Sequence, residues 1–281
     1  MEQDRQGSED HRRLIANARM YSVEAVTAAA WRVLLDWVAQ RAGVACATID
    51  HPAPSSLETL WSRPDLGCAF MCGYPFARAA PQPAALAAPV PSPARYRGEA
   101  VYWTDLVVRD DSPLQTITDA FGRRMAYTIP TSQSGYQAPR RFLAPYARER
   151  GGPLFASLVG PLVTPRRVAE AVVAGDADVG PLDSYAHDLL QKHDPALAGR
   201  LRTIASTAPT PIPPLVAAPA VDAQVTRRLR EALYAVASAD ELASLRDDLL
   251  VDRFVAADAR AYEELLAQAD EADRLGYPRL A

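Results

Sequence analysis

The sequence predicts an α/β protein of two lobes, each a mixed sheet flanked by helices, joined by two chain crossings. Strand-like and helix-like segments alternate along most of the 281 residues, and they do so in two units of similar rhythm. The 24 prolines concentrate at 81–93 and 209–214, beside the two places where the chain passes between the units. With 49% hydrophobic and 23% charged residues, the composition is that of a globular protein with a sizeable core.

The first unit begins with an apolar run at 14–20 and a helix at 24–42. That helix places Trp31, Leu34 and Val38 on one face. A short helix at 55–61 is indicated by a serine cap, with Glu58 three residues after Ser55. The other features expected here are strands at 44–49 and 66–71, a turn at 73–75, and a loop with a short strand at 79–90.

The second unit starts with the segment 100–109, whose aromatic and β-branched residues predict a strand. The elements expected after it are helices at 114–121, 135–148, 165–174 and 183–192, and strands at 124–128, 154–159, 178–180 and 201–206, with a loop at 129–134. A strand at 215–218 and helices at 222–237, 239–248 and 257–274 then return to the first unit. We therefore expect a disordered tail at 1–12, a first lobe of 13–103 with 213–281, and a second lobe of 104–212.

Charge and motif content exclude several classes of function. A net charge of −4 and a pI near 5.6 provide no basic field for nucleic acid or an anionic membrane. The sequence contains no GxGxxG or P-loop motif, and its three cysteines form no set of metal ligands, so we expect neither cofactor nor metal. The polar first residues lack the apolar run of a secretory signal, which favours the cytoplasm. We expect a monomer.

The most informative segment for function runs from 131 to 136. Ser132, Gln133 and Ser134 lie between a predicted strand and a predicted helix, and Gly135 follows them. A helix N-terminus offers free N–H donors and a partial positive charge, which together suit an anion. The alternative is a plain helix cap, since Ser and Thr are common there.

Several further segments complete a pattern. Residues 132–139 read Ser-x-Ser-Gly-x-x-x-Pro, with Tyr102 and Trp103 about thirty residues earlier. Gly73, Tyr74 and a proline follow the third strand, and Ala-Asp-Val-Gly at 177–180 precedes Asp183. Together these segments resemble the phosphonate-type solute-binding proteins of ABC transporters, within the type 2 periplasmic-binding-protein class.

The resemblance implies a cleft site for a small anionic ligand between the lobes. It places the oxyanion at Ser132, Gln133 and Ser134, beside Gly135. It also implies contacts from the crossing and from the rim of the first lobe, and it points one carboxyl at the cleft. The residues concerned are Tyr21, Gly73, Tyr74, Tyr102 and Asp183. It implies an ABC transporter permease as partner and a periplasmic location, in contrast to the missing signal.

Some positions depart from the family pattern. Gln133 replaces the usual threonine, no Gly-Ser-His precedes the helix at 165, and the acidic residue that can hold a ligand amine is replaced within 211–214. Phosphonate, phosphate, another oxyanion or a carboxylate-bearing metabolite remain open as ligands. We predict a binding protein without enzymatic activity. The alternative is a cytoplasmic enzyme or ligand sensor on the same fold that acts on a small carboxylate, with Asp183 as the leading acid–base candidate.

Overall fold

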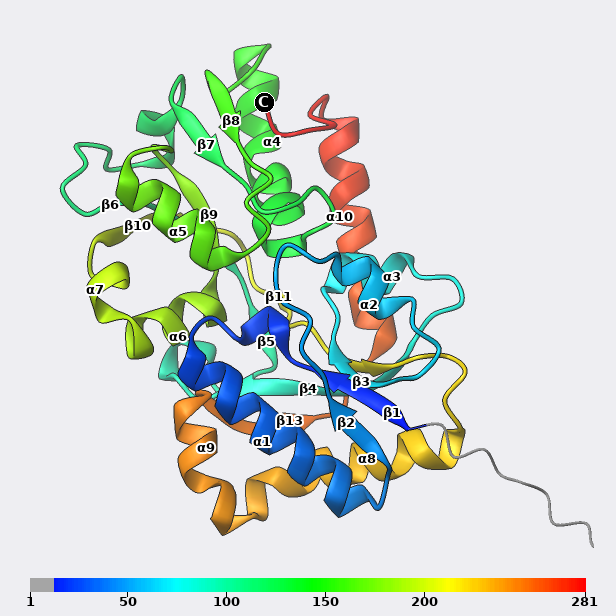
Figure 1. Ribbon diagram of the computed structural model, residues 1–281. Helices are drawn as coiled ribbons and strands as arrows, with labels where there is room; N and C mark the ends of the chain where they lie inside the picture. The colour runs from blue at the N-terminus through cyan, green and yellow to red at the C-terminus, as the bar shows by residue number, and fades with distance from the viewer. Residues whose placement is uncertain (1–12) are drawn as a thin grey trace, which may run out of the picture.

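A computed structural model describes residues 13–281, so the tail expected at 1–12 lies outside the described residues. The chain forms two stacked lobes, the first at the bottom of Figure 1 and the second at the top. Among residues 13–281, no helix combines the length and apolarity needed to cross a membrane.

The first lobe contains a six-stranded mixed sheet in the order β13-β4-β12-β3-β1-β2. Its β1 pairs in parallel with β2 and β3, whereas β12 and β13 run antiparallel to their neighbours. The strands are β1 (Leu14–Asn17), β2 (Cys46–Thr48), β3 (Leu66–Phe70), β4 (Ala84–Pro91), β12 (Leu215–Ala217) and β13 (Val251–Val255).

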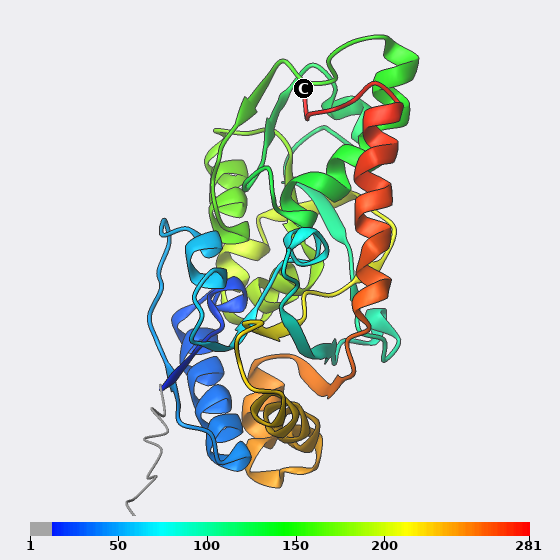
Figure 2. The ribbon, with the colours of Figure 1, turned by 90° about the vertical axis from the view of Figure 1, so that its right-hand side faces the viewer.

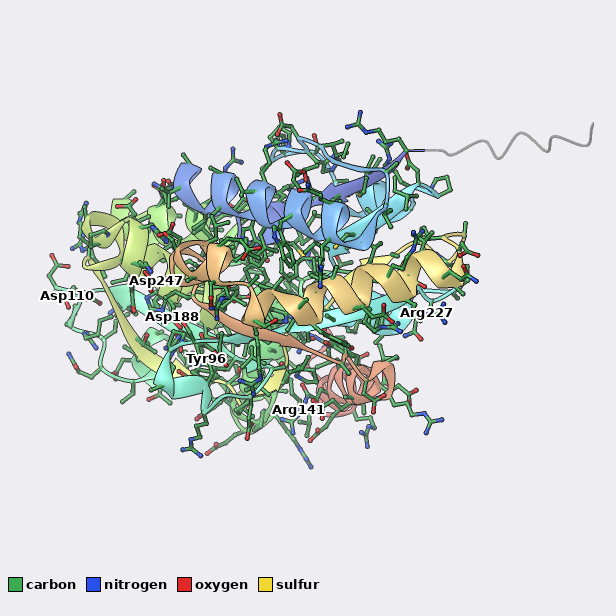
Figure 3. All side chains as sticks on the ribbon, turned by 90° about the horizontal axis from the view of Figure 1, so that it is seen from below. Tyr96, Asp110, Arg141, Asp188, Arg227 and Asp247 are labelled. Carbon is green, nitrogen blue, oxygen red and sulfur yellow. The ribbon has the colours of Figure 1, made fainter. Side chains whose placement is uncertain are left out.

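Helices cover both faces of this sheet. On one face α1 (Ala25–Ala42) and α8 (Ala223–Ala235) pack against each other, with α9 (Ala243–Asp248) beside α1 (Figure 3). The 3-10 turns η5 (Val236–Ser238) and η6 (Asp240–Leu242) connect α8 to α9. On the other face lie α2 (Leu57–Trp61) and α3 (Gly73–Arg78). Along β12, Leu215 faces the first layer and Val216 the second, as strand alternation requires.

Two strands of this sheet correct the sequence-based prediction. The region 79–90 was predicted as a loop with a short strand, yet β4 is an eight-residue strand. Its Pro89 and Pro91 pair only with β13, because β12 pairs with residues 84–87, so β4 tolerates two missing N–H donors. The chain beyond 222 was predicted to be entirely helical, and β13 is therefore a second correction. The expected turn at 73–75 is the start of α3.

The second lobe contains the strands β10-β6-β9 and the pair β7-β8, joined by a parallel bridge between Met125 and Val179. The strands are β6 (Thr104–Arg109), β7 (Arg124–Ala126), β8 (Ser157–Val159), β9 (Gly180–Asp183) and β10 (Leu201–Ser206). The helices are α4 (Ala138–Arg150), α5 (Pro165–Ala174), α6 (Ser184–His193) and α7 (Pro195–Ala198).

Two predictions for this lobe were wrong. The helix expected at 114–121 is a single 3-10 turn, η3 (Ile117–Ala120). The strand expected at 178–180 is β9, which starts at Gly180 and continues through Pro181 to Asp183. Proline inside a strand is unusual, so the sequence favoured an earlier end.

The two crossings pair with each other. β5 (Val101–Tyr102) and β11 (Thr210–Pro211) form a short antiparallel ribbon between the lobes. Trp103 separates β5 from β6, so the single strand predicted at 100–109 is two. Arg95 lies in the turn η2 (Ala94–Tyr96), with its Cζ 4.9 Å from the centre of the Trp103 ring. Its Nε donates a hydrogen bond to Oδ2 of Asp188 on α6 at 3.1 Å. These contacts connect η2 to α6 beside the ribbon.

A third connection joins the lobes near the C-terminus. The turn η7 (Ala259–Tyr262) packs against α3, and α10 (Glu263–Arg274) then runs along the side of the molecule to the second lobe (Figure 2). There the buried Arg140 of α4 donates to the carbonyls of Ala269 and Tyr277 at 2.9 and 3.0 Å. The expected assignment of 213–281 to the first lobe does not include this packing, in which Tyr277 and Leu280 join the second lobe's core.

Candidate functional site

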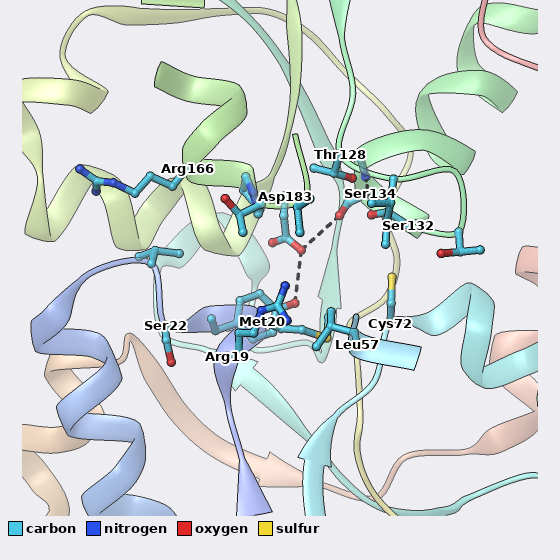
Figure 4. A pocket seen from close by; sticks show the side chains of 18 of the residues that line it. Arg19, Met20, Ser22, Leu57, Cys72, Thr128, Ser132, Ser134, Arg166 and Asp183 are labelled. Carbon is cyan, nitrogen blue, oxygen red and sulfur yellow. Dashed lines mark hydrogen bonds between the residues drawn. The ribbon is translucent and has the colours of Figure 1, made fainter. Parts of the chain in front are cut away.

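A cavity of about 220 Å³ lies in the cleft, with walls from both lobes (Figure 4). The first lobe contributes the turn η1 (Arg19–Tyr21), residues of α2, and Cys72 after β3. The second contributes the segment 128–135, the loop before α5 and the end of β9. In Figure 4, Cys72 and Ser132 lie at one end of the cavity and Ser22 and Arg166 at the other.

The hydroxyl-rich segment begins a helix, as predicted. Ser132 is the N-cap, and its Oγ accepts a hydrogen bond from the Gly135 N–H at 3.0 Å. The first turn, η4 (Gln133–Gln137), is a π-helix, a form often found at functional sites, and α4 follows it directly. A Cβ at Gly135 would lie 1.9 Å from Thr128 Oγ1, so only glycine fits at this approach of helix and strand.

Asp183 ends β9 and caps α6 inside the cleft. Its Oδ1 accepts from the N–H groups of Tyr185 and Ala186, both at 3.0 Å. Its Oδ2 accepts from Tyr21 Oη at 3.3 Å and from Ser134 Oγ at 3.4 Å. Burial raises the pKa of this carboxyl to about 7, although these four hydrogen bonds oppose the rise. The cavity therefore contains an acid that can keep its proton near neutral pH.

The lobes touch across the cleft beside the cavity. The backbone N–H of Gln133 donates to Cys72 Sγ at 3.1 Å. Thr131 Oγ1 donates to Glu58 at 3.3 Å, and Arg166 pairs with Glu24 at the start of α1. The cavity is thus bounded by contacts that only a closed arrangement of the lobes can make.

The structure brings most of the predicted site residues together. Five of them line the cavity: Tyr21, Ser132, Ser134, Gly135 and Asp183. Two more are buried just behind it, Gln133 and Tyr102. Burial raises the pKa of Tyr102 well above its usual value, and nearby Cys72 and Asp183 add to the rise. The last two, Gly73 and Tyr74, lie outside the lining: a Cβ at Gly73 would be 2.6 Å from Leu265 of α10, and Tyr74 lies under Arg78.

Sequence reasoning missed part of the lining. Arg19 lies on η1, where only Tyr21 was predicted, and Cys72 directly precedes the predicted Gly73. An apolar wall was also missed, formed by residues such as Met20, Leu57 and Val163. The place of Arg19 just after β1 could have indicated its role, because the carboxyl ends of parallel strands meet at one edge of a sheet. No sequence pattern indicates Val163, which depends on the loop before α5.

The fold and its cleft define a two-lobed solute-binding protein. The chain belongs to the family described as ABC transporter, phosphonate, periplasmic substrate-binding protein, which matches residues 21–262. The search of curated proteins found no match.

Solved structures of the same architecture confirm the predicted type 2 fold class. A binding protein component of an ABC phosphonate transporter from Pseudomonas aeruginosa is 18% identical, with a TM-score of 0.79 over 94% of this chain and 88% of that one. PhnD1 from Prochlorococcus marinus, in complex with methylphosphonate, is 15% identical, with a TM-score of 0.74 over 93% and 98%. The alkanesulfonate-binding protein SsuA from Xanthomonas axonopodis, bound to MOPS, is 18% identical, with a TM-score of 0.59 over 95% of each chain.

Proposed function

We propose that this protein binds a small oxyanion, a phosphonate, phosphate or related acid, as the substrate-binding component of an ABC-type uptake system. One observation carries the proposal. The hydroxyl-bearing start of the helix at 132–135 lies in the wall of a cavity that both lobes enclose, where Ser134 and Tyr21 both donate hydrogen bonds to Asp183.

The groups around the cavity suit an acid with several oxygens. Ser132 and Ser134 stand at the N-terminus of a helix, where the partial positive charge favours an anion. The hydroxyls of Tyr21 and Ser134 donate to Asp183 over 3.3 and 3.4 Å, longer than the usual O–H···O distance. Such weak hydrogen bonds can be exchanged for stronger ones to a charged ligand oxygen.

Whether that exchange is favourable depends on the protonation state of Asp183. An ionised carboxylate beside a bound oxyanion would repel it, whereas a protonated carboxyl can donate a hydrogen bond to it. With a pKa of about 7, Asp183 can take up a proton as the ligand enters. We therefore expect affinity for an acid to rise as the pH falls through 7.

The family and its relatives support a transport role. Two of the solved structures with this fold hold methylphosphonate and the sulfonate MOPS. We propose binding without turnover, since the partners of Asp183 within residues 13–281 are hydroxyls and backbone amides that orient it. We further propose a monomer that works with a permease in the periplasm and takes no nucleic acid.

A thermal-shift panel tests the proposal. Phosphate, phosphite, methylphosphonate, a sulfonate and small carboxylates are each added to wild-type protein and to Ser134→Ala. A ligand at a hundred times its Kd should raise the wild-type Tm by about 5 °C, and the rise should be smaller in Ser134→Ala. Ser238→Ala, a change at an exposed position far from the cleft, is the control and should respond like wild type. A flat response across all of these acids would contradict the proposal.

A further inference from the structure

The cavity is larger than a simple tetrahedral acid needs. A cavity of about 150 Å³ is enough to hold benzene, and this one measures about 220 Å³. Methylphosphonate, with one carbon, would leave much of that space unfilled. The cavity therefore has room for a substituent on the acid.

The part of the lining away from the hydroxyls is apolar. The side chains that form it come from both lobes: Met20, Leu57, Trp61, Ile129, Val163 and Pro181. In Figure 4, Met20 and Leu57 lie below Asp183 and Ser134, on the opposite side of the cavity. An acid group at the helix start would thus direct its substituent along an apolar surface.

A second hollow, mainly on the first lobe, borders the cavity. This hollow measures about 510 Å³ and shares Arg19, Ser22 and Thr164 with the cavity. Its other walls include Trp31 of α1 and His51, which follows β2. The indole N–H of Trp31 is buried and has no hydrogen-bond partner in the part of the chain that the structure describes. Ser22, which lines both spaces, lies at the end of the cavity opposite Ser132, so a passage between the two spaces would run past this residue.

From the apolar wall and these shared lining residues we propose that the ligand is an oxyanion with an extended alkyl or aryl substituent. The acid group binds at Ser132 and Ser134, and the substituent lies against the apolar wall and leaves past Ser22 into the hollow. This inference rests on the proposed function and adds the class of substrate. Each methylene buried against such a wall should raise affinity about fourfold, which corresponds to about 0.8 kcal/mol.

The test is a calorimetric titration with methyl-, propyl-, hexyl- and phenylphosphonate. Hexyl- and phenylphosphonate are expected to bind at least tenfold more tightly than methylphosphonate. Equal or weaker binding of the longer acids would overturn the inference and leave the proposed function standing. Failure of every phosphonate to bind would also overturn the inference, and the proposed function would fall with it only if phosphate, phosphite and the sulfonate gave no thermal shift either.

A variant at the passage locates the substituent. Ser22 is half-buried and is shared by the cavity and the hollow, so Ser22→Phe should narrow the passage. The ratio of hexyl to methyl affinity should fall towards one, while Ser238→Ala keeps the wild-type ratio. Ser22→Leu is a smaller change that serves the same purpose if the phenylalanine variant does not fold. A ratio unchanged in a folded Ser22 variant would contradict the proposed path.

Discussion

Replacement of Asp183 by asparagine should change how the stability of the protein depends on pH. In the folded chain this carboxyl is 4% exposed and keeps its proton up to about pH 7, whereas an unfolded aspartate loses it near 3.8. Between these values the folded state binds more protons than the unfolded state. The free energy of unfolding therefore falls as the pH rises from about 4 to 7, by about 1.4 kcal/mol per pH unit.

The size of the effect follows from that slope. Between pH 5.5 and pH 8 the wild-type protein should lose about 2 kcal/mol from this group, most of it below pH 7. The amide of the Asp183→Asn variant has no proton to lose in this range. Asparagine caps helices as well as aspartate does, so the hydrogen bonds from Tyr185 and Ala186 can persist. The variant should thus lose about 2 kcal/mol less than wild type between about pH 5.5 and 8.

Urea unfolding of both proteins at pH 5.5 and pH 8 measures this difference directly. Contributions from groups that both proteins share cancel in the comparison. Asp110→Asn, at the exposed end of β6, is the control and should follow the wild-type dependence. Equal losses in wild type and Asp183→Asn would refute the argument that burial holds this proton.

Three further predictions concern the contact between α4 and the C-terminal segment, the turn at Gly135, and the thiol of Cys72. Arg140→Met removes the side chain that donates to two backbone carbonyls of the C-terminal segment, and urea unfolding should show that the free energy of unfolding falls by about 2–4 kcal/mol. The control Arg141→Met breaks only a half-exposed ion pair and should lower the free energy of unfolding by less than about 1 kcal/mol. Gly135→Ala drives a methyl group into Thr128, so both Tm and ligand affinity should fall, and a variant with wild-type values would contradict the described turn. Burial raises the pKa of the Cys72 thiol to about 11, so at pH 8 a disulfide reagent should modify it far more slowly than a free cysteine, and saturating ligand should slow it further.

Local sequence signals were sufficient for much of the fold. The first helix, the serine cap at 132 and the strand at 215 were predicted because periodicity and capping act within a few residues. Only a short strand within a loop was predicted where β4 lies, because prolines normally interrupt a strand, and here they are accommodated where β4 pairs with β13 alone. That pairing joins residues more than 150 positions apart, which no local pattern records.

The candidate site likewise contains residues that a local motif predicts and residues that only the folded chain brings together. Ser132 and Ser134 belong to a motif with its own local geometry, and the sequence found them. Arg19, Cys72 and Val163 line the cavity because three separate loops meet there, so their role depends on the assembled lobes. Gly73 matched the family pattern but packs against α10, whose position along both lobes the sequence did not reveal.

The central claim is that an oxyanion binds at the start of the helix at 132–135, between the lobes. Calorimetric titration of methylphosphonate into wild type, Ser134→Ala and the control Ser238→Ala tests it most directly. Loss of a hydrogen bond to a charged ligand should weaken binding to Ser134→Ala by about 1–3 kcal/mol, or roughly 5- to 150-fold, and leave Ser238→Ala unchanged. The same dissociation constant in all three proteins would contradict the claim.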